Sequence, residues 1–170
     1  MTTHNIYISL GSNIEIRVDY LQKACDLIAL KIGGITKYSK IYQTPPWGFE
    51  SALFLNACIC VSTNLSTKNC LQQLQTIEKE LGRLKKQSEG YEARPIDLDI
   101  IYSSEGIFCF EDLVVPHSLM QDRKFVLIPL QNIAATIKHP LLHKTTQELL
   151  NKCKDNSEVT ATDYSFKRMN

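Results

Sequence analysis

Residues 54–63 read Phe-Leu-Asn-Ala-Cys-Ile-Cys-Val-Ser-Thr, a run with no glycine, proline or charged residue. The side chains of a strand point alternately to its two faces. One face of this run is apolar throughout and consists of Leu55, Ala57, Ile59 and Val61. The other face is mixed and consists of Phe54, Asn56, Cys58 and Cys60. The run therefore predicts a long strand with two different faces, around which the other elements can be placed.

Two helices and three further strands are predicted around this strand. The apolar side chains of residues 16–32 and 66–81 recur at helical spacing. Strand-like runs occupy residues 6–10, 35–42 and 96–102. The order strand, helix, strand, strand, helix, strand matches the ferredoxin-like βαββαβ core. We therefore expect an α+β fold in which helices pack on an antiparallel sheet.

The C-terminal part of the chain predicts smaller additions to this core. A hairpin is expected to turn through residues 103–106, and short helices are expected near residues 124–134 and 145–152. Residues 156–170 are polar and are expected to form a loose tail. We expect one domain over residues 1–170, with its core at about residues 5–135.

Composition excludes several classes of function. The net charge is +1, which provides no broad field for nucleic acid or an anionic membrane. The apolar runs are far shorter than a membrane span, and the strand-like start leaves no room for a signal peptide. The six cysteines lack the spacing of a zinc site and suit a reducing compartment. We therefore expect a cytoplasmic protein without a membrane or nucleic-acid partner, and we expect a monomer.

Asp97 and Asp99 alternate with Ile96, Leu98 and Ile100 in the last predicted strand. With the apolar residues in the core, both carboxylates project from the opposite face. They would repel each other unless a cation lay between them, and Mg²⁺ commonly takes one or two carboxylates plus substrate phosphates. A solvated polar face would show the same alternation, so the strand alone leaves both interpretations open.

Basic residues gather in the segment before this strand, at Arg83, Lys85, Lys86 and Arg94. Such a segment beside paired carboxylates is what phosphoryl transfer requires, because cationic groups neutralise charge on the transferring group. An ordinary basic surface loop remains the alternative. The chain has no glycine-rich P-loop and no nucleophile elbow, so an ATP site here would not be of the Walker type.

Two further pairs of residues are candidates for ligand contacts. His117 follows a proline, and Arg123 lies six residues further on, so the two could reach one anion. Phe54 and Phe125 could form the two walls around a flat ligand. Surface and core roles, respectively, are the alternatives for these pairs.

Seven short motifs over residues 6–135 together resemble the 6-hydroxymethyl-7,8-dihydropterin pyrophosphokinase family of folate synthesis. They occur in the family's order: Gly11-Ser12-Asn13; Thr44-Pro45-Pro46-Trp47-Gly48; Phe54-Leu55-Asn56; Glu78 with Gly82-Arg83; Arg94-Pro95-Ile96-Asp97-Leu98-Asp99-Ile100; Pro116-His117; and Arg123-Lys124-Phe125.

The resemblance implies a role for each matched position. The catalytic set would be Arg83, Arg94, Asp97 and Asp99, and the two aspartates would bind two Mg²⁺ ions. The pterin site would consist of Thr44, Pro46, Trp47, Phe54, Asn56 and Phe125. ATP, the co-substrate, would contact Glu78, Arg83, Lys85, Arg94, His117 and Arg123. The chain departs from the bacterial pattern at Lys85, Tyr91, Asp112, Val114 and Ser118, so the resemblance does not assign the adenine and ribose contacts.

The expected reaction transfers pyrophosphate from ATP to the pterin hydroxymethyl group and releases AMP. Two alternatives of other classes remain at this point. One is a ferredoxin-like module that binds a small ligand without chemistry. The other is a metal-dependent phosphodiesterase acting on nucleic acid, which would want a wider basic surface than this chain has.

Overall fold

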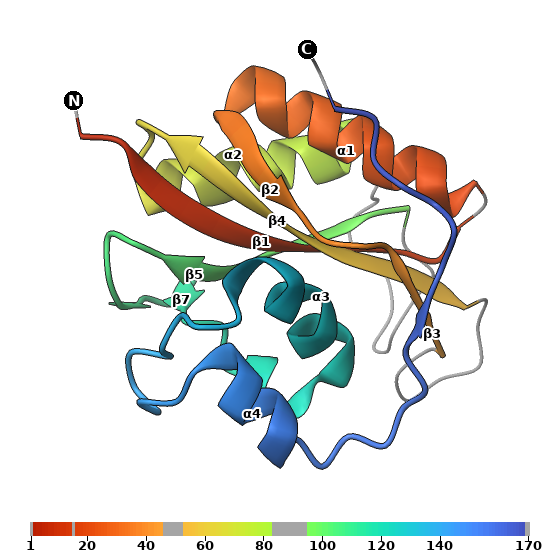
Figure 1. The fold of residues 1–170 in the computed structure, drawn as a ribbon. Coiled ribbons are helices and arrows are strands. Elements are labelled where there is room, and N and C mark those ends of the chain that lie inside the picture. Colours follow the sequence, from red (N-terminus) through yellow and green to blue (C-terminus); the bar gives the residue numbers. More distant parts are fainter. Residues whose placement is uncertain (1, 15, 46–52, 83–94, 169–170) are drawn as a thin grey trace.

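The computed structural model describes residues 2–14, 16–45, 53–82 and 95–168. Its main sheet is antiparallel and runs in the order β5-β1-β4-β3-β8, with β2 also paired to β4 (Figure 1). The central pair is β1 (His4–Ser12) and β4 (Phe54–Thr63), and β5 (Asp97–Ser103) lies on the outer side of β1. The edge beyond β4 is shared by β2 (Gly34–Tyr38) and β3 (Tyr42–Thr44). This order is the predicted ferredoxin-like arrangement.

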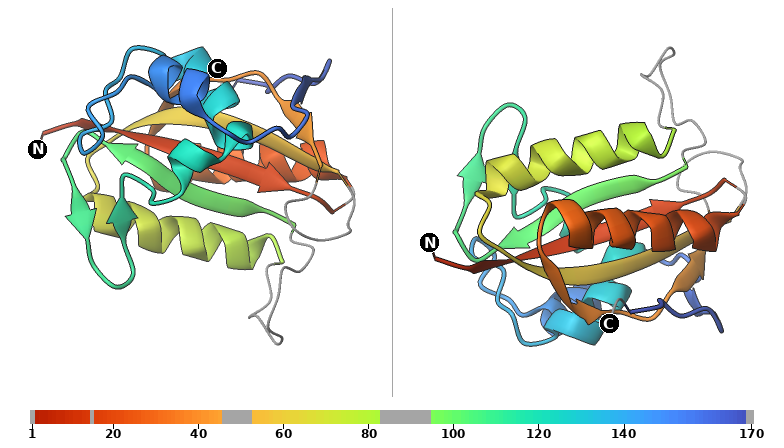
Figure 2. Two further views of the ribbon diagram at one scale, coloured as in Figure 1. Left: turned by 90° about the horizontal axis from the view of Figure 1, so that it is seen from below. Right: turned by 90° about the horizontal axis from the view of Figure 1, so that it is seen from above.

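Helices cover both faces of the sheet. The two helices of the predicted core, α1 (Arg17–Lys31) and α2 (Thr67–Glu80), lie together on one face (Figure 1, Figure 2). The other face carries α3 (Lys124–Ala134) and α4 (Thr146–Lys152) (Figure 2). All four helices agree with the sequence-based prediction to within one or two residues.

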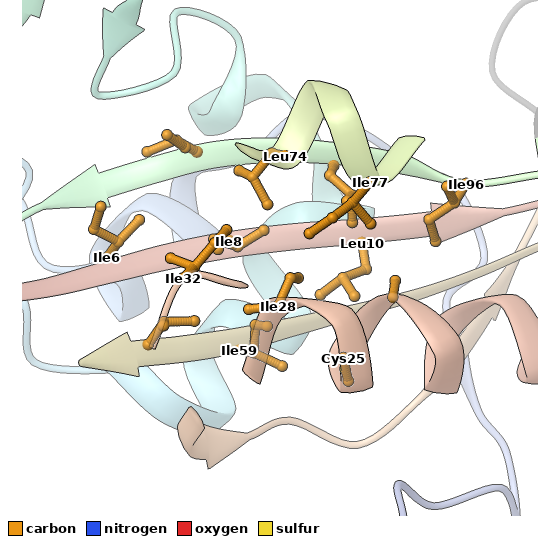
Figure 3. Close-up of a cluster of buried hydrophobic side chains, with 14 of the residues drawn as sticks. Ile6, Ile8, Leu10, Cys25, Ile28, Ile32, Ile59, Leu74, Ile77 and Ile96 are labelled. Atoms are coloured by element: carbon orange, nitrogen blue, oxygen red, sulfur yellow. The ribbon is translucent and has the colours of Figure 1, made fainter. Parts of the chain in front are cut away.

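The face toward α1 and α2 is apolar. Ile6, Ile8 and Leu10 of β1 are fully buried there, against Ile28 of α1 and Leu74 of α2 (Figure 3). The predicted apolar face of β4 belongs to the same cluster. Burial of each such side chain stabilises the fold by about 1.5–3 kcal/mol. This layer therefore stabilises the sheet, and it supplies no polar side chain to a functional site.

One glycine explains how closely α1 approaches the sheet. A Cβ atom built on Gly33, just after α1, would lie 2.2 Å from the backbone oxygen of Ser62 on β4. No side chain fits at that distance, so only glycine allows the chain to leave α1 and pair at once with β4 as β2.

The predicted hairpin exists, but its turn lies elsewhere. The paired strands are β6 (Phe108–Cys109) and β7 (Val114–Val115), and Phe110 and Leu113 bond to each other across the turn. Residues 103–106 instead form the turn that leaves β5. The glycine in that turn, Gly106, has a positive φ of 124°. A glycine in the sequence indicates that a turn can form there, but it does not indicate which strands the turn connects. A 3-10 turn, η1 (Met120–Asp122), leads from the hairpin to α3.

The expectation of a loose tail is wrong for residues 156–168. Thr160–Ala161 forms β8, which pairs with β3, and later tail residues contact α1 and β2. Strand pairing uses main-chain groups, so a polar sequence can pack in this way without an apolar pattern. Residues 169–170 lie outside the described part of the chain.

The cysteines behave as small buried side chains. All six are free thiols, and Cys25, Cys58, Cys60 and Cys70 are buried. Burial raises the pKa of the Cys25 and Cys58 thiols. Among the described residues, no helix combines the length and the apolar character needed to cross a membrane.

Candidate active site

The face of the sheet toward α3 carries a row that crosses three strands and includes two predicted site residues, Asp97 and Asn56. Asp97 of β5 lies opposite Gly11 of β1, and Gly11 lies opposite Asn56 of β4. The next row on this face runs from Asp99 through Ser9 to Cys58. Cys58 belongs to the cluster that packs under α3, so both rows face the α3 side. The register therefore brings the predicted metal and pterin residues onto one surface.

Asp97 and Asp99 project from β5 on this surface, and both are half-buried. Within the described ranges, no group of three or more His, Cys, Asp or Glu side chains could hold a metal ion. Mg²⁺ needs six oxygen ligands and keeps several of them from water and phosphate. The two carboxylates therefore fit Mg²⁺ as part of a site that bound phosphate would complete.

Glu78 lies behind the carboxylates rather than beside them. Its side chain is buried, and its Oε1 accepts a hydrogen bond of 2.8 Å from the backbone N–H of Leu98. Because β5 is an edge strand, this bond gives a partner to a backbone donor that lies between Asp97 and Asp99 in the chain. A charged acceptor makes such a bond strong. A contact of Glu78 with nucleotide stays a prediction.

His117 lies close enough to both Asp97 and Arg123 for their charges to act on its ring. The backbone N–H of His117 donates to the carbonyl oxygen of Ile101 on β5, at 3.1 Å. The His117 Nδ1 accepts the Leu119 N–H at 3.2 Å, so the neutral ring carries its proton on Nε2. Burial lowers the pKa of His117, the positive charge of Arg123 lowers it further, and Asp97 opposes both. At neutral pH, His117 is therefore an uncharged hydrogen-bond donor beside an arginine.

Phe54 and Phe125, the predicted walls of a flat site, come from two different elements of the fold. Phe54 is the first residue of β4 and Phe125 lies in the first turn of α3, and both are half-buried. The guanidinium of Arg123 lies 5.8 Å from the centroid of the Phe125 ring. Asn56, also on β4, donates from its Nδ2 to the Oγ1 of Thr44 on β3 at 2.7 Å, and both residues are buried.

Two contributors were missed from the sequence. A Cβ atom on Gly11 would lie 3.0 Å from Asn56 Oδ1 and 3.9 Å from the Phe54 ring. Gly11 therefore leaves the middle of the row open, which a glycine directly after a predicted strand could have indicated. The Arg17 guanidinium donates to the Leu53 carbonyl and holds the start of β4 beside Phe54. Nothing local in the sequence indicates this second contact.

Five predicted site residues lie outside the described part of the chain: Pro46, Trp47, Arg83, Lys85 and Arg94. The residues that flank the basic segment are described. A Cβ atom on Gly82 would lie 3.9 Å from Pro95 Cγ. The two residues that flank the basic segment therefore lie together, and Pro95 comes two residues before Asp97.

Comparison with known families and proteins shows which family the sequence matches. The family described as 7,8-dihydro-6-hydroxymethylpterin-pyrophosphokinase (HPPK) matches residues 7–135. A protein of Porphyromonas gingivalis named 2-amino-4-hydroxy-6-hydroxymethyldihydropteridine pyrophosphokinase is 39% identical over 138 residues, which are 79% of this chain and 93% of the relative. The protein of the same name from Bacillus subtilis is 39% identical over 156 residues, covering 90% of this chain and 92% of the relative.

Solved structures show the same fold. A Plasmodium falciparum HPPK-DHPS chain, solved with pterin and p-hydroxybenzoate, superposes with a TM-score of 0.73 at 17% identity, over 89% of this chain. The match covers 42% of that longer chain. At this identity, the likeness concerns the fold alone.

Proposed function

Because the chain belongs to the 7,8-dihydro-6-hydroxymethylpterin-pyrophosphokinase family, we propose that it transfers pyrophosphate from ATP to the hydroxymethyl group of 6-hydroxymethyl-7,8-dihydropterin in folate synthesis. The observation that supports this most directly is the row from Asp97 through Gly11 to Asn56. It puts a pair of phosphate-side carboxylates beside a buried amide, with an open position between them. A pterin and a nucleotide phosphate must meet in such an arrangement for the transfer to occur.

The pterin lies between Phe54 and Phe125 in this proposal. Stacking on both faces orients a planar ring system, and the buried amide of Asn56 reads its edge by hydrogen bonding. Thr44 fixes that amide through the 2.7 Å hydrogen bond. The hydroxymethyl group then points along the row toward Asp97.

The triphosphate lies over β5 beside His117 and Arg123. The Nε2–H of His117 and the guanidinium of Arg123 are donors for phosphate oxygens. Magnesium at Asp97 and Asp99, two ions in the proposal, would supply neutralisation of phosphate charge. The basic segment is proposed to add positive charge near the triphosphate through Arg83, Lys85 and Arg94. Two of these residues, Arg83 and Arg94, are proposed to act at the group that is transferred.

The reaction is an in-line displacement at the β-phosphorus. The hydroxymethyl oxygen forms a bond to that phosphorus, the bond from the phosphorus to the α–β bridging oxygen breaks, and AMP leaves. The hydroxymethyl proton is released to solvent. Alignment of the two substrates and stabilisation of charge supply the rate enhancement, as is usual in phosphoryl transfer.

The family match favours this transferase over a non-catalytic ligand-binding module and over a phosphodiesterase. The number of magnesium ions, a monomeric state, a single domain and a cytoplasmic location remain predictions from the sequence.

AMP release from ATP, measured with Mg²⁺ and with or without the pterin, tests the proposal. We expect AMP only when Mg²⁺ and the pterin are both present, with one pyrophosphorylated pterin formed for each AMP. Pterin binding without AMP would support the ligand-binding module. Metal-dependent cleavage of an oligonucleotide without the pterin would support the phosphodiesterase.

A further inference from the structure

Residues 155–168 form a strap that leaves α4, passes the edge of the sheet at β3 and ends beside α1 (Figure 1). This C-terminal strap lies outside residues 7–135, the part that matches the family. Three sets of contacts fix it to the molecule.

The first contact joins the strap to the N-terminus of α3. Asp155 Oδ2 accepts the backbone N–H of Lys124 at 2.9 Å, and its Oδ1 accepts the Ser157 N–H at 2.8 Å. Arg123 occupies the N-cap position of α3 without a side-chain capping bond, so Asp155 caps the helix from a distant part of the chain. Burial raises the pKa of Asp155, but hydrogen bonds from Ser157 and Lys124 outweigh it, and the net pKa lies below its usual value. The carboxylate is thus a charged acceptor at neutral pH.

The residue that Asp155 holds lies between two predicted site residues. Lys124 is flanked by Arg123 on the phosphate side and by Phe125 on the pterin side. The last turn of α3 is joined to the β3 side by Asn132, whose Oδ1 accepts the Lys40 N–H at 3.0 Å and the Tyr42 hydroxyl at 2.9 Å. That contact lies more than one helical turn from Phe125, whereas Asp155 bonds to the backbone of the residue directly before Phe125.

The second contact joins the strap to β3. Tyr42 and Gln43 pair with Ala161 and Thr160 of β8. The backbone N–H and the hydroxyl of Thr162 both donate to the Ile41 carbonyl, at 3.0 and 2.8 Å. β3 has three residues and ends at Thr44, whose hydroxyl accepts the hydrogen bond from the Asn56 side chain. A strand this short gains its order from neighbours on both sides.

The third contact fixes the far end of the strap. The Phe166 ring lies 5.3 Å from the Tyr38 ring. Gln22 of α1 exchanges two hydrogen bonds with the backbone of Lys167, at 2.8 and 3.0 Å. The strap is thus fixed at Asp155 and at Phe166 and Lys167, and β8 lies between these two points. A shift of the strap at Asp155 would therefore also move β8.

We propose that the C-terminal strap sets the separation of the two sides of the pterin site, with Asp155 positioning Phe125 and β8 positioning Thr44. The inference rests on the proposed function, because it concerns the fit of the pterin. Asp155 is a positioning residue, since it reaches the ligand only through the first turn of α3. The strap reaches both the Phe125 and the Thr44 sides of the site, while the carboxylates of β5 are held by other contacts.

Replacement of Asp155 tests the first part of the proposal, in which Asp155 positions Phe125. We expect Asp155→Ala to raise the pterin dissociation constant about tenfold, as expected when part of a charge-assisted hydrogen bond is lost from the bound state. Asp155→Asn keeps one acceptor oxygen and should show a smaller effect. Glu158→Ala removes an exposed carboxylate from the same strap and should leave affinity unchanged. Fluorescence titration of each variant, at a temperature where thermal unfolding shows it folded, provides the numbers.

A double-mutant cycle with Phe125→Ala separates positioning from general loosening. If Asp155 acts through the Phe125 ring, its replacement should have no further effect on pterin affinity once that ring is absent. If Asp155→Ala lowered pterin affinity equally in wild type and in Phe125→Ala, the positioning of Phe125 by Asp155 would be overturned. If Asp155→Ala does not fold, Asp155→Asn is used in the same cycle.

The second arm is tested with Phe166→Ala, for which the exposed Tyr164 offers a matched control in Tyr164→Ala. We expect Phe166→Ala to raise the pterin dissociation constant and the KM for pterin by a few-fold, with kcat unchanged. Equal pterin affinity in both variants and wild type would overturn this arm. Wild-type protein that binds no pterin would instead contradict the proposed function, so the two failures are distinguishable.

Discussion

Asp97 and Asp99 come from one strand, whereas Thr44, Phe54 and Phe125 come from three separate elements. The spacing of the two carboxylates follows from the period of a strand, so packing elsewhere hardly changes it. The gap between the two phenylalanines depends on how α3 packs against the sheet and on what holds its first turn. The carboxylate half of the site should therefore tolerate changes in packing, and the pterin half should be sensitive to them.

The largest effect is expected at the carboxylates. Asp97→Ala should reduce turnover by about 10³-fold or more, because charge on the phosphates is no longer neutralised. The fold should be retained, because the half-buried Asp97 side chain belongs to neither of the two apolar clusters. Activity at saturating Mg²⁺ and circular dichroism check both points. Asp163→Ala, at an exposed position on the strap, is the control, and near-normal turnover of Asp97→Ala would reject the assignment of the metal site.

The aromatic wall should affect affinity more selectively. Phe125→Ala should weaken pterin binding by about 2–4 kcal/mol, from lost stacking and burial. MgATP binding should change much less, because His117 and the carboxylates are untouched. Calorimetric titration of each substrate separates the two effects. Unchanged pterin affinity would remove Phe125 from the site.

Replacement of Glu78 tests whether the position of the two carboxylates is independent of the pterin half of the site. Glu78→Ala should expose the Leu98 amide to exchange and lower stability by about 1.5–3 kcal/mol, the value of a hydrogen bond to a charged group. Glu78→Gln keeps an acceptor and should restore most protection. Hydrogen exchange at Leu98 and urea unfolding measure these effects. Loss of pterin affinity as large as the loss of MgATP affinity would show that the two halves are coupled.

The smallest effect concerns pH. Because burial lowers the pKa of His117 in the folded protein, the unfolded chain binds a proton at higher pH than the folded chain. The histidine's contribution to stability is therefore present above its unfolded pKa and is lost as pH falls through the folded pKa. In metal-free buffer, the melting temperature should fall less for His117→Gln than for wild type between about pH 7.5 and pH 5. Parallel curves would contradict this assignment.

The sequence by itself determined the four helices, the main strands of the core and the half of the site that depends on local spacing. Alternation over residues 54–63 and 96–102 predicted two strands, their faces and the joint projection of Asp97 and Asp99. Helical spacing predicted α1 and α2, and the ordered motifs indicated the family. These features are local, because a strand or helix period is expressed within a few consecutive residues.

The tertiary structure alone decided which distant groups support the site. The contacts of Glu78 with Leu98, of Arg17 with Leu53 and of Asp155 with Lys124 each join a polar side chain to a backbone group far along the chain. A backbone N–H or C=O has the same chemistry at nearly every residue, so no sequence pattern indicates which side chain will reach it. The packing of the sheet, the helices and the strap makes that selection.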